Sequence, residues 1–203
     1  MNQFVSQASH EDFFRARNKA LINDLQHFLN PEETKLLSFN DIKQMLKPRN
    51  EIYLGMKVVP IELIVGSEGR YQDFDNRFFP RSAHLKTRWA RIDQAHLSDI
   101  ILPPITLNEI GGLYFVRDGN HRVSVARHNG QTHIEAYVTE VVTRVPLTGE
   151  VDLDNLIIKE EYAKFLERTH LDKYFPDLEL EVTEPGGYAR LLDHIDVNRY
   201  YMG

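Results

Sequence analysis

The chain has 203 residues, of which 42% are hydrophobic and 27% are charged, and this balance predicts a globular protein of one domain, or of one domain with an appendage. It has no cysteine, which excludes disulfide bonds and zinc sites with cysteine ligands. The net charge is −6, and residues 150–203 hold 13 acidic and 6 basic residues, so we expect no strong non-specific binding of nucleic acid. No run of 18 apolar residues is present, and the first residues lack the pattern of a secretory signal, so we expect a cytoplasmic protein that does not enter membranes.

The first 50 residues predict helices. Ser9 to Asp12 has the pattern of a capping box, and an apolar stripe follows it at Phe14, Leu21, Leu25 and Phe28. Asn30-Pro31 predicts a second helix, which Ser38 to Asp41 restarts and Pro48 ends near Lys47, with Ile42, Met45 and Leu46 facing inward. We expect these helices to brace the rest of the fold, and a partner-binding helical hairpin is the alternative.

Strand patterns begin after Gly55. Residues 56–65 are rich in β-branched side chains, and Pro60 marks an edge strand or a strand end. Residues 66–69 then read as a loop that carries Glu68. From the residues alone, Glu68 is more simply explained as a solvated loop carboxylate than as a catalytic group.

Residues 77–91 form the most cationic stretch, with five Lys or Arg and no acidic residue, and they follow an aromatic, irregular segment that begins at Tyr71. Aromatic side chains are interleaved at Tyr71, Phe74, Phe78, Phe79 and Trp89. Two interpretations remain open. The segment stacks a base or binds a nucleic-acid strand, or it is a loop folded onto the core.

A strand, a turn and a helix follow in the second half. Residues 85–97 predict a helix, 100–107 an extended run with two prolines, and Gly111-Gly112 a primed hairpin turn. Residues 113–116 then predict a strand, which Asp118-Gly119 connects to a helix that begins near Asn120 and ends at Asn129-Gly130.

This turn is a candidate anion-binding site. The first backbone N–H groups of a helix have no intrahelical acceptor, the helix dipole is positive there, and Gly119 lets a ligand approach the backbone. His121 and Arg122 add donors, and the arginine fork fits phosphate or carboxylate oxygens. The alternative is that Asp118 only caps the helix and that Arg122 makes a surface ion pair.

The stretch from Asp118 to Arg122, with Gly130 and the strand-like residues 134–138 after it, resembles the ParB N-terminal/sulfiredoxin superfamily over about residues 55–142. In ParB proteins the corresponding stretch is Gly-Glu-Arg-Arg and holds nucleotide phosphates. In sulfiredoxin it is Gly-Gly-Cys-His-Arg, and Asn120 replaces that cysteine here, which excludes sulfinic acid reduction through a protein thiol. The free-serine kinases of this superfamily carry Asp-Gly-His-His-Arg, which is the most similar of the three.

The resemblance implies a mixed α/β fold with a ParB/sulfiredoxin-like sheet. It implies a nucleotide, with ATP, ADP and CTP not distinguished, bound with Mg²⁺ at Asp118, Gly119, Asn120, His121 and Arg122 and by the further candidates Arg70 and Arg81. It also implies a phosphotransferase acting on a small hydroxyl acceptor, in which Glu68 is the base and His121 the second catalytic residue. The Gln-Pro-Arg ending of the first ParB box is absent, although Arg70 stands near its place.

Other function classes stay open. A nucleotide-switched regulatory module, or a nucleic-acid-binding module without catalysis, has the same phosphate turn, and a second copy of the chain is a candidate partner. The nuclease activity often ascribed to ParB-like domains has weak support, because no carboxylate cluster for a metal is recognisable. No metal-ligating residues are assigned.

The chain is thus predicted to consist of a helical extension (1–50), a ParB/sulfiredoxin-like domain (51–145) and a C-terminal extension packed on the core (146–203). In the last part, residues 156–171 predict an acidic helix, 178–182 a short strand, and Thr183-Glu-Pro-Gly-Gly the start of a last helix. No helix-turn-helix of the ParB kind follows. Tyr188, Tyr200 and Tyr201 either pack internally or face a partner.

Overall fold

A computed structural model describes residues 3–27, 34–46, 48, 50–142, 153–178 and 180–202. The chain folds as two units, one made of residues 1–40 and 51–141 and the other of residues 41–50 and 142–203. The sequence-based boundaries near residues 50 and 145, and the packing of the C-terminal extension on the core, stay predictions.

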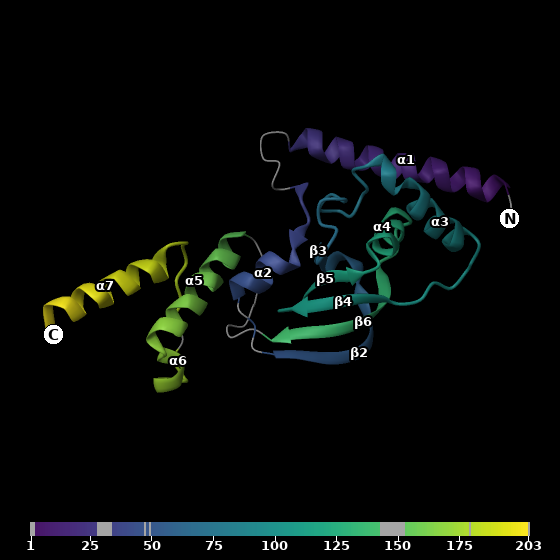
Figure 1. The fold of residues 1–203 in the computed structure, drawn as a ribbon. Helices are drawn as coiled ribbons and strands as arrows, with labels where there is room; N and C mark the ends of the chain where they lie inside the picture. Colours follow the sequence, from purple (N-terminus) through teal and green to yellow (C-terminus); the bar gives the residue numbers. More distant parts are fainter. Residues whose placement is uncertain are drawn as a thin grey trace. The chain divides into compact units, whose positions relative to one another are not determined.

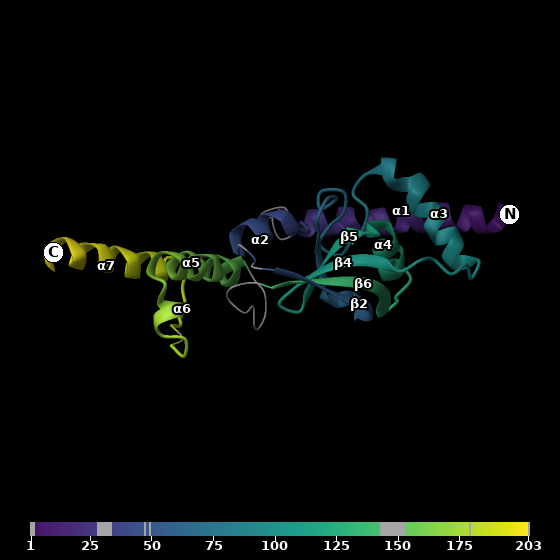
Figure 2. The same ribbon diagram turned by 60° about the horizontal axis from the view of Figure 1, so that its bottom comes forward.

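The first unit contains one mixed sheet with helices over it, and the expected mixed α/β class is confirmed. In the described residues the strand order is β1-β3-β5-β4-β6-β2. The strands are β1 (Leu37–Ser38), β2 (Asn50–Pro60), β3 (Ile64–Ser67), β4 (Ile105–Ile110), β5 (Leu113–Asp118) and β6 (His133–Val142). The helices are α1 (Gln3–Gln26), α3 (Lys86–Leu97) and α4 (Asn120–His128). Figures 1 and 2 show α3 and α4 over one face of the sheet.

One hairpin makes two neighbouring strands of the sheet antiparallel. Strands β4 and β5 are antiparallel, with Ile110 opposite Leu113, whereas β5 runs parallel to β3 and β4 runs parallel to β6. Both linking glycines, Gly111 and Gly112, have positive φ, of 59° and 85°. This is the conformation that a primed turn requires, so the predicted hairpin is confirmed.

Most of the predicted elements after residue 50 are confirmed. The strand predicted over residues 56–65 is instead two strands, because Pro60 ends β2 and a 3-10 turn, η2 (Ile61–Leu63), leads into β3. The loop predicted at 66–69 is wrong in its first half, because Gly66 and Ser67 lie in β3. The predicted helix at 85–97 is the 3-10 turn η3 (Ala83–Leu85) continued by α3, and α4 and β6 lie where the sequence predicts them. The run at 100–107 is extended only at its end, since β4 begins at Ile105.

The predicted face of the first helix is wrong. Ser9 does not cap a helix but lies inside α1, where its hydroxyl donates to the Val5 carbonyl at 3.0 Å. Phe14, Leu21 and Leu25 of the predicted stripe are exposed, and the buried residues are Ser9, Phe13, Ala16, Ala20 and Asn23. These five recur at helical spacing, and the two alanines allow α1 to pack closely on α3. Phe28 and the helix start predicted at Asn30-Pro31 lie outside the described residues.

The aromatic residues of the cationic segment complete the core of this unit. Trp89, Phe74 and Phe78 are fully buried, and Phe79 is nearly so. The Trp89 indole donates to the Ser124 hydroxyl at 2.9 Å, and its ring meets the edge of Phe13. These aromatic rings are therefore part of the core, as the interpretation of residues 71–91 as a loop folded onto the core requires.

The second unit is helical in its described part. It comprises most of α2 (Phe39–Leu46), and α5 (Leu153–Thr169), α6 (Leu171–Tyr174) and α7 (Gly187–Met202). Helix α2 confirms the predicted start near Ser38, and its Ile42 and Leu46 are buried as predicted, whereas the Met45 side chain lies outside the described residues.

Helices α5 and α7 pack through a small aromatic core. The Tyr188 ring stacks on Tyr162 with a centroid distance of 4.8 Å, and its hydroxyl donates to the Leu180 carbonyl. Tyr188 therefore packs internally, whereas Tyr201 is exposed. The strand predicted at 178–182 is wrong for the described residues, which have no regular structure there. Across the described ranges, every helix is too short or too polar to cross a membrane.

Candidate anion-binding site

The turn between β5 and α4 is built around Gly119. Its φ of 112° and ψ of 19° are left-handed, and a Cβ at this position would lie 2.5 Å from Cγ2 of Ile105. Its carbonyl accepts the first helical hydrogen bond, from the Val123 amide at 3.0 Å. The preceding amides of α4 have no acceptor within the helix, as at every helix start, so they are directed at whatever lies beyond the turn.

A cleft of about 340 Å³ lies at this helix start. Arginines from three separate segments reach it: Arg70 after β3, Arg88 on α3, and Arg117 and Arg122 on either side of the turn. Strands β3 and β5 are parallel neighbours, with Ser67 opposite Val116, so the segments that follow them meet at the same edge of the sheet. The complete lining is Gly69, Arg70, Arg88, Ile92, Arg117, Asp118, Gly119, Asn120, His121 and Arg122.

Three of the four cleft arginines have carboxylate partners. Arg70 pairs with Asp73 at 3.1 Å, Arg117 with Glu68 at 3.8 Å, and Arg122 with Asp118 at 2.5 Å. Arg88 is exposed and has no ion pair with any residue that the structure describes. An incoming anion can therefore bind Arg88 without displacing a carboxylate.

Arg122 has a structural role that the sequence did not indicate. Its guanidinium donates to the carbonyls of Pro103 and Pro104, the latter at 2.9 Å, and only a small part of its side chain is exposed. These bonds attach the segment before β4 to the start of α4. Arg122 lines the cleft as predicted, but most of its hydrogen-bonding capacity is occupied within the protein.

Two polar side chains at the start of α4 are buried with unpartnered atoms. Asn120 is 7% exposed and His121 is 4% exposed. Within the described structure, Oδ1 of Asn120 and Nδ1 of His121 have no hydrogen-bond partner. Both residues line the cleft, and a native protein rarely leaves buried polar atoms unpaired.

His121 is neutral at pH 7. Burial, followed by the charges of Arg88 and Arg70, lowers the pKa of His121 from 6.5 to about 4. Its ring meets the buried Phe74 ring edge to face at 5.4 Å, which fixes its orientation. The imidazole can therefore offer one N–H donor and one acceptor, but not the positive charge of a protonated histidine.

Glu68 lies directly after β3 and beside the cleft. Its amide donates to the Val116 carbonyl at 3.0 Å, and its carboxylate lies 3.3 Å from Nδ2 of Asn108 and 3.8 Å from Nε of Arg117. Its chain neighbour Gly69 and its ion-pair partner Arg117 line the cleft, whereas Glu68 itself does not. No group of three potential metal ligands occurs among the described residues.

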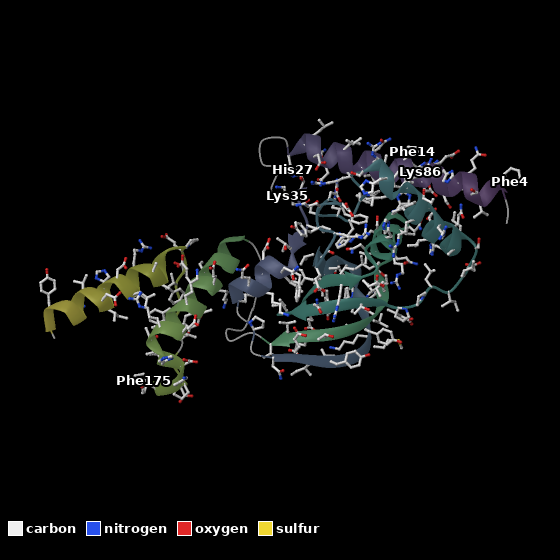
Figure 3. All side chains as sticks on the ribbon, viewed as in Figure 1. Phe4, Phe14, His27, Lys35, Lys86 and Phe175 are labelled. Carbon is white, nitrogen blue, oxygen red and sulfur yellow. The ribbon has the colours of Figure 1, made fainter. Side chains whose placement is uncertain are left out.

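The structure does not bring Arg81 to the cleft. Its guanidinium pairs with Asp24 at 2.8 Å and donates to the Thr34 carbonyl at 2.7 Å, so it connects α1 to the loop that follows it. Other cations of the 77–91 segment also have internal partners. Arg77 pairs with the buried Asp75, and Nζ of Lys86 lies 4.6 Å from the centre of the Phe14 ring (Figure 3).

Two of the cleft arginines, Arg88 and Arg117, were absent from the site predicted from the sequence. Arg117 directly precedes the predicted turn, which is a signal that could have been used. Arg88 is more than 30 residues away and is brought in only by the packing of α3 on α4.

The chain matches no model of a known protein family, and no curated protein matches it in sequence.

Proposed function

We propose that this is a ParB/sulfiredoxin-type protein that binds a nucleotide, or a similar phosphorylated ligand, in the cleft at the start of α4. The observation that carries the proposal is that Arg88, which has no ion-pair partner among the described residues, lines the same cleft as the first residues of α4. Charge-assisted bonds from a guanidinium, together with a helix N-terminus, are the usual protein ligands of phosphate oxygens.

Isothermal titration calorimetry with inorganic phosphate, ADP, ATP and CTP, with and without Mg²⁺, tests this proposal. Arg88→Ala should weaken binding by about 10- to 150-fold, the equivalent of roughly 1.5–3 kcal/mol for hydrogen bonds to a charged group. Arg91→Ala is the matched control, because Arg91 is an exposed arginine on the same helix that does not line the cleft. The absence of binding at millimolar concentration to the folded protein, or equal losses in both variants, contradicts the proposal.

The second candidate is phosphoryl transfer to a small hydroxyl-bearing acceptor. The position of Glu68 beside Arg117 favours it, because a carboxylate near a phosphate site can remove the acceptor's proton. The acceptor oxygen then forms the new bond to phosphorus, and the bond from phosphorus to the leaving oxygen breaks. Neutral His121 supplies a hydrogen bond to a phosphate oxygen. Any Mg²⁺ would come bound to the nucleotide's own phosphate oxygens and neutralise their charge.

Turnover measurements separate this enzyme from a regulatory module. If Glu68 is the base, Glu68→Gln should lower turnover by about 10²- to 10⁴-fold and leave nucleotide affinity nearly unchanged. Glu140→Gln, on β6, controls for the loss of one carboxylate elsewhere in the same sheet. Nucleotide binding without any turnover, with or without Mg²⁺, leaves a nucleotide-switched module as the function. In either case we expect a cytoplasmic protein, with a second copy of the chain as a candidate partner.

A further inference from the structure

Helix α1 exposes a stripe of large apolar side chains. Four of them are between 45% and 72% exposed, and they are Phe14, Leu21, Ile22 and Leu25. The residues of α1 that face the core are Ser9, Phe13, Ala16, Ala20 and Asn23. With about 3.6 residues per turn, the stripe lies on the opposite side of the helix from these five. Figure 1 shows α1 on the far side of α3 and α4 from the sheet, so the stripe faces away from the core of this unit.

The stripe has the spacing of a coiled-coil seam. Phe14, Leu21 and Leu25 are separated by seven and four residues, which are the intervals between the d and a positions of a heptad repeat. Asn18 is exposed and occupies the a position between Phe14 and Leu21, where coiled coils use a single asparagine to fix register and the number of partners. Helix α1 is already held by its packing on α3, so a partner helix would not have to induce it.

The charges beside the seam match those of a second, antiparallel copy of α1. If Phe14 of one copy lies against Leu25 of the other, Arg17 and Asp24 occupy the flanking g positions that meet across the seam. The two-fold symmetry of such a dimer makes this ion pair twice. A parallel pair would instead place Glu11, at the preceding a position, against Glu11 of the second copy, and two like charges oppose binding. The charge pattern therefore favours the antiparallel pair.

Both members of this ion pair have hydrogen-bonding capacity to spare. Arg17 has no carboxylate partner among the described residues, and its Nε donates to the Arg81 carbonyl at 3.4 Å. Asp24 accepts from Arg81 through Oδ1 at 2.8 Å, so Oδ2 can accept from a second guanidinium. At the other flanking positions, the apolar stem of Arg15 would cover Ile22 of the second copy.

We infer that α1 is the contact surface of a homodimer, in which two copies of the helix pair antiparallel through Phe14, Leu21 and Leu25. In this register, residues 13–26 of the two helices overlap, over about 21 Å. A contact of this length is small, so we expect a weak dimer with a Kd of roughly 10–100 µM. The inference is independent of the proposed function, because no residue of the arginine cleft belongs to the seam.

Sedimentation equilibrium of the full chain, between about 5 and 500 µM, measures this Kd. Leu21→Glu and Leu25→Glu each place a charge in the seam and should weaken the dimer about 30-fold or more. Phe4→Glu is the matched control and should leave the Kd unchanged, because Phe4 is an exposed apolar residue of the same helix outside the overlap (Figure 3). Unchanged circular dichroism shows that each variant is folded.

Two charge reversals test the antiparallel register. Arg17→Glu should weaken the dimer by about 3- to 10-fold, because it places two like charges at each flanking pair. Lys19→Glu causes the same change in net charge on an exposed residue away from the seam, so it should have little effect.

The absence of cysteine from the chain allows a direct measurement of orientation. His10 is exposed, so His10→Cys can carry a single spin label on each copy. In the antiparallel register the two labels should lie about 30 Å apart, because residue 10 of each copy lies 19 residues along the axis from the other. A parallel pair would place them within about 15 Å of each other.

Three results would overturn the inference. The first is a protein that stays monomeric up to the highest concentration. The second is a dimer that Leu21→Glu and Leu25→Glu leave intact, or that Phe4→Glu weakens equally, because its contact then lies elsewhere. The third is a label separation typical of the parallel pair.

Discussion

The segment 77–91 and the cleft at the turn 118–122 each contain several arginines, but the structure uses their guanidinium groups differently. In the segment, Arg81 pairs with Asp24 and donates to the Thr34 carbonyl, and the aromatic rings around it are buried. At the turn, the arginines surround a cleft, and Arg88 enters it from the segment itself. A cationic stretch therefore favours a binding site only at an arginine such as Arg88, which has no carboxylate partner among the described residues, whereas the other three cleft arginines have one.

The largest expected effect concerns a buried aromatic ring, that of Phe74. Phe74 is fully buried, so Phe74→Ala should lower the free energy of unfolding by about 3–5 kcal/mol, the usual cost of removing a buried phenyl ring. Urea denaturation monitored by circular dichroism measures it. A loss below 1 kcal/mol, with a loss of ligand affinity instead, would mean that the ring faces a ligand and is not part of the core.

The pH dependence of the free energy of unfolding tests the buried, neutral state of His121 at the cleft. The pKa of His121 is about 4 in the folded state and near 6.5 in the unfolded state, so between these values the unfolded chain binds more protons. Stability should therefore fall as the pH falls from 6.5 to 4, by up to roughly 3 kcal/mol from this group. Burial also lowers the pKa of His128, so the difference between the wild type and His121→Gln isolates the contribution of His121. Parallel stability curves for the two proteins would contradict the buried, neutral state of His121.

Two arginines of the same segment should respond in opposite ways. Arg81→Ala breaks an ion pair and a bond to the Thr34 carbonyl, so it should lower the free energy of unfolding by about 1–3 kcal/mol and leave phosphate affinity intact. Arg88→Ala should leave stability within about 0.5 kcal/mol, because the side chain is exposed, and should weaken phosphate binding. Paired measurements of unfolding and of phosphate binding check both. The comparison fails if the two variants lose affinity equally.

The smallest expected effect is on the binding of nucleic acid. Arg81 and Lys86 have partners within the protein, and the segment's aromatic rings are buried, so we expect no salt-sensitive binding of single-stranded oligonucleotides. Fluorescence anisotropy at 50 and 200 mM salt measures it. Binding that falls steeply with salt and weakens in Arg81→Ala or Lys86→Ala would restore the nucleic-acid interpretation.

Local sequence predicted the turn well, because its conformation depends on few residues. Gly119 allows the positive φ, Asn129-Gly130 ends the helix, and Gly111-Gly112 reverses the chain, so each signal lies within the element that it defines. The face of α1 was mistaken because the buried side combines two polar residues, Ser9 and Asn23, with alanines, while larger apolar residues remain exposed. Tertiary packing decides which face of α1 is buried, and the pattern of hydrophobic residues alone does not reveal it.

The roles of the individual arginines were harder to predict than the conformation of the turn. Arg122 was expected to bind a ligand, but the carbonyls that occupy its guanidinium belong to Pro103 and Pro104, nearly 20 residues earlier. Arg81 and Arg88 lie seven residues apart in one cationic stretch, yet only Arg88 reaches the cleft. These differences depend on which elements pack together, and a single sequence does not encode them in any local pattern.

A titration of the ¹⁵N-labelled protein with inorganic phosphate, followed by two-dimensional NMR, tests the central claim most directly. If the cleft at the start of α4 is an anion site, the backbone amides of residues 119–122 and the side-chain Nε of Arg88 should shift together and saturate with one affinity, and Arg88→Ala should abolish or greatly weaken the response. The account is contradicted if millimolar phosphate leaves these signals in place, or if the shifts occur only in other parts of the chain.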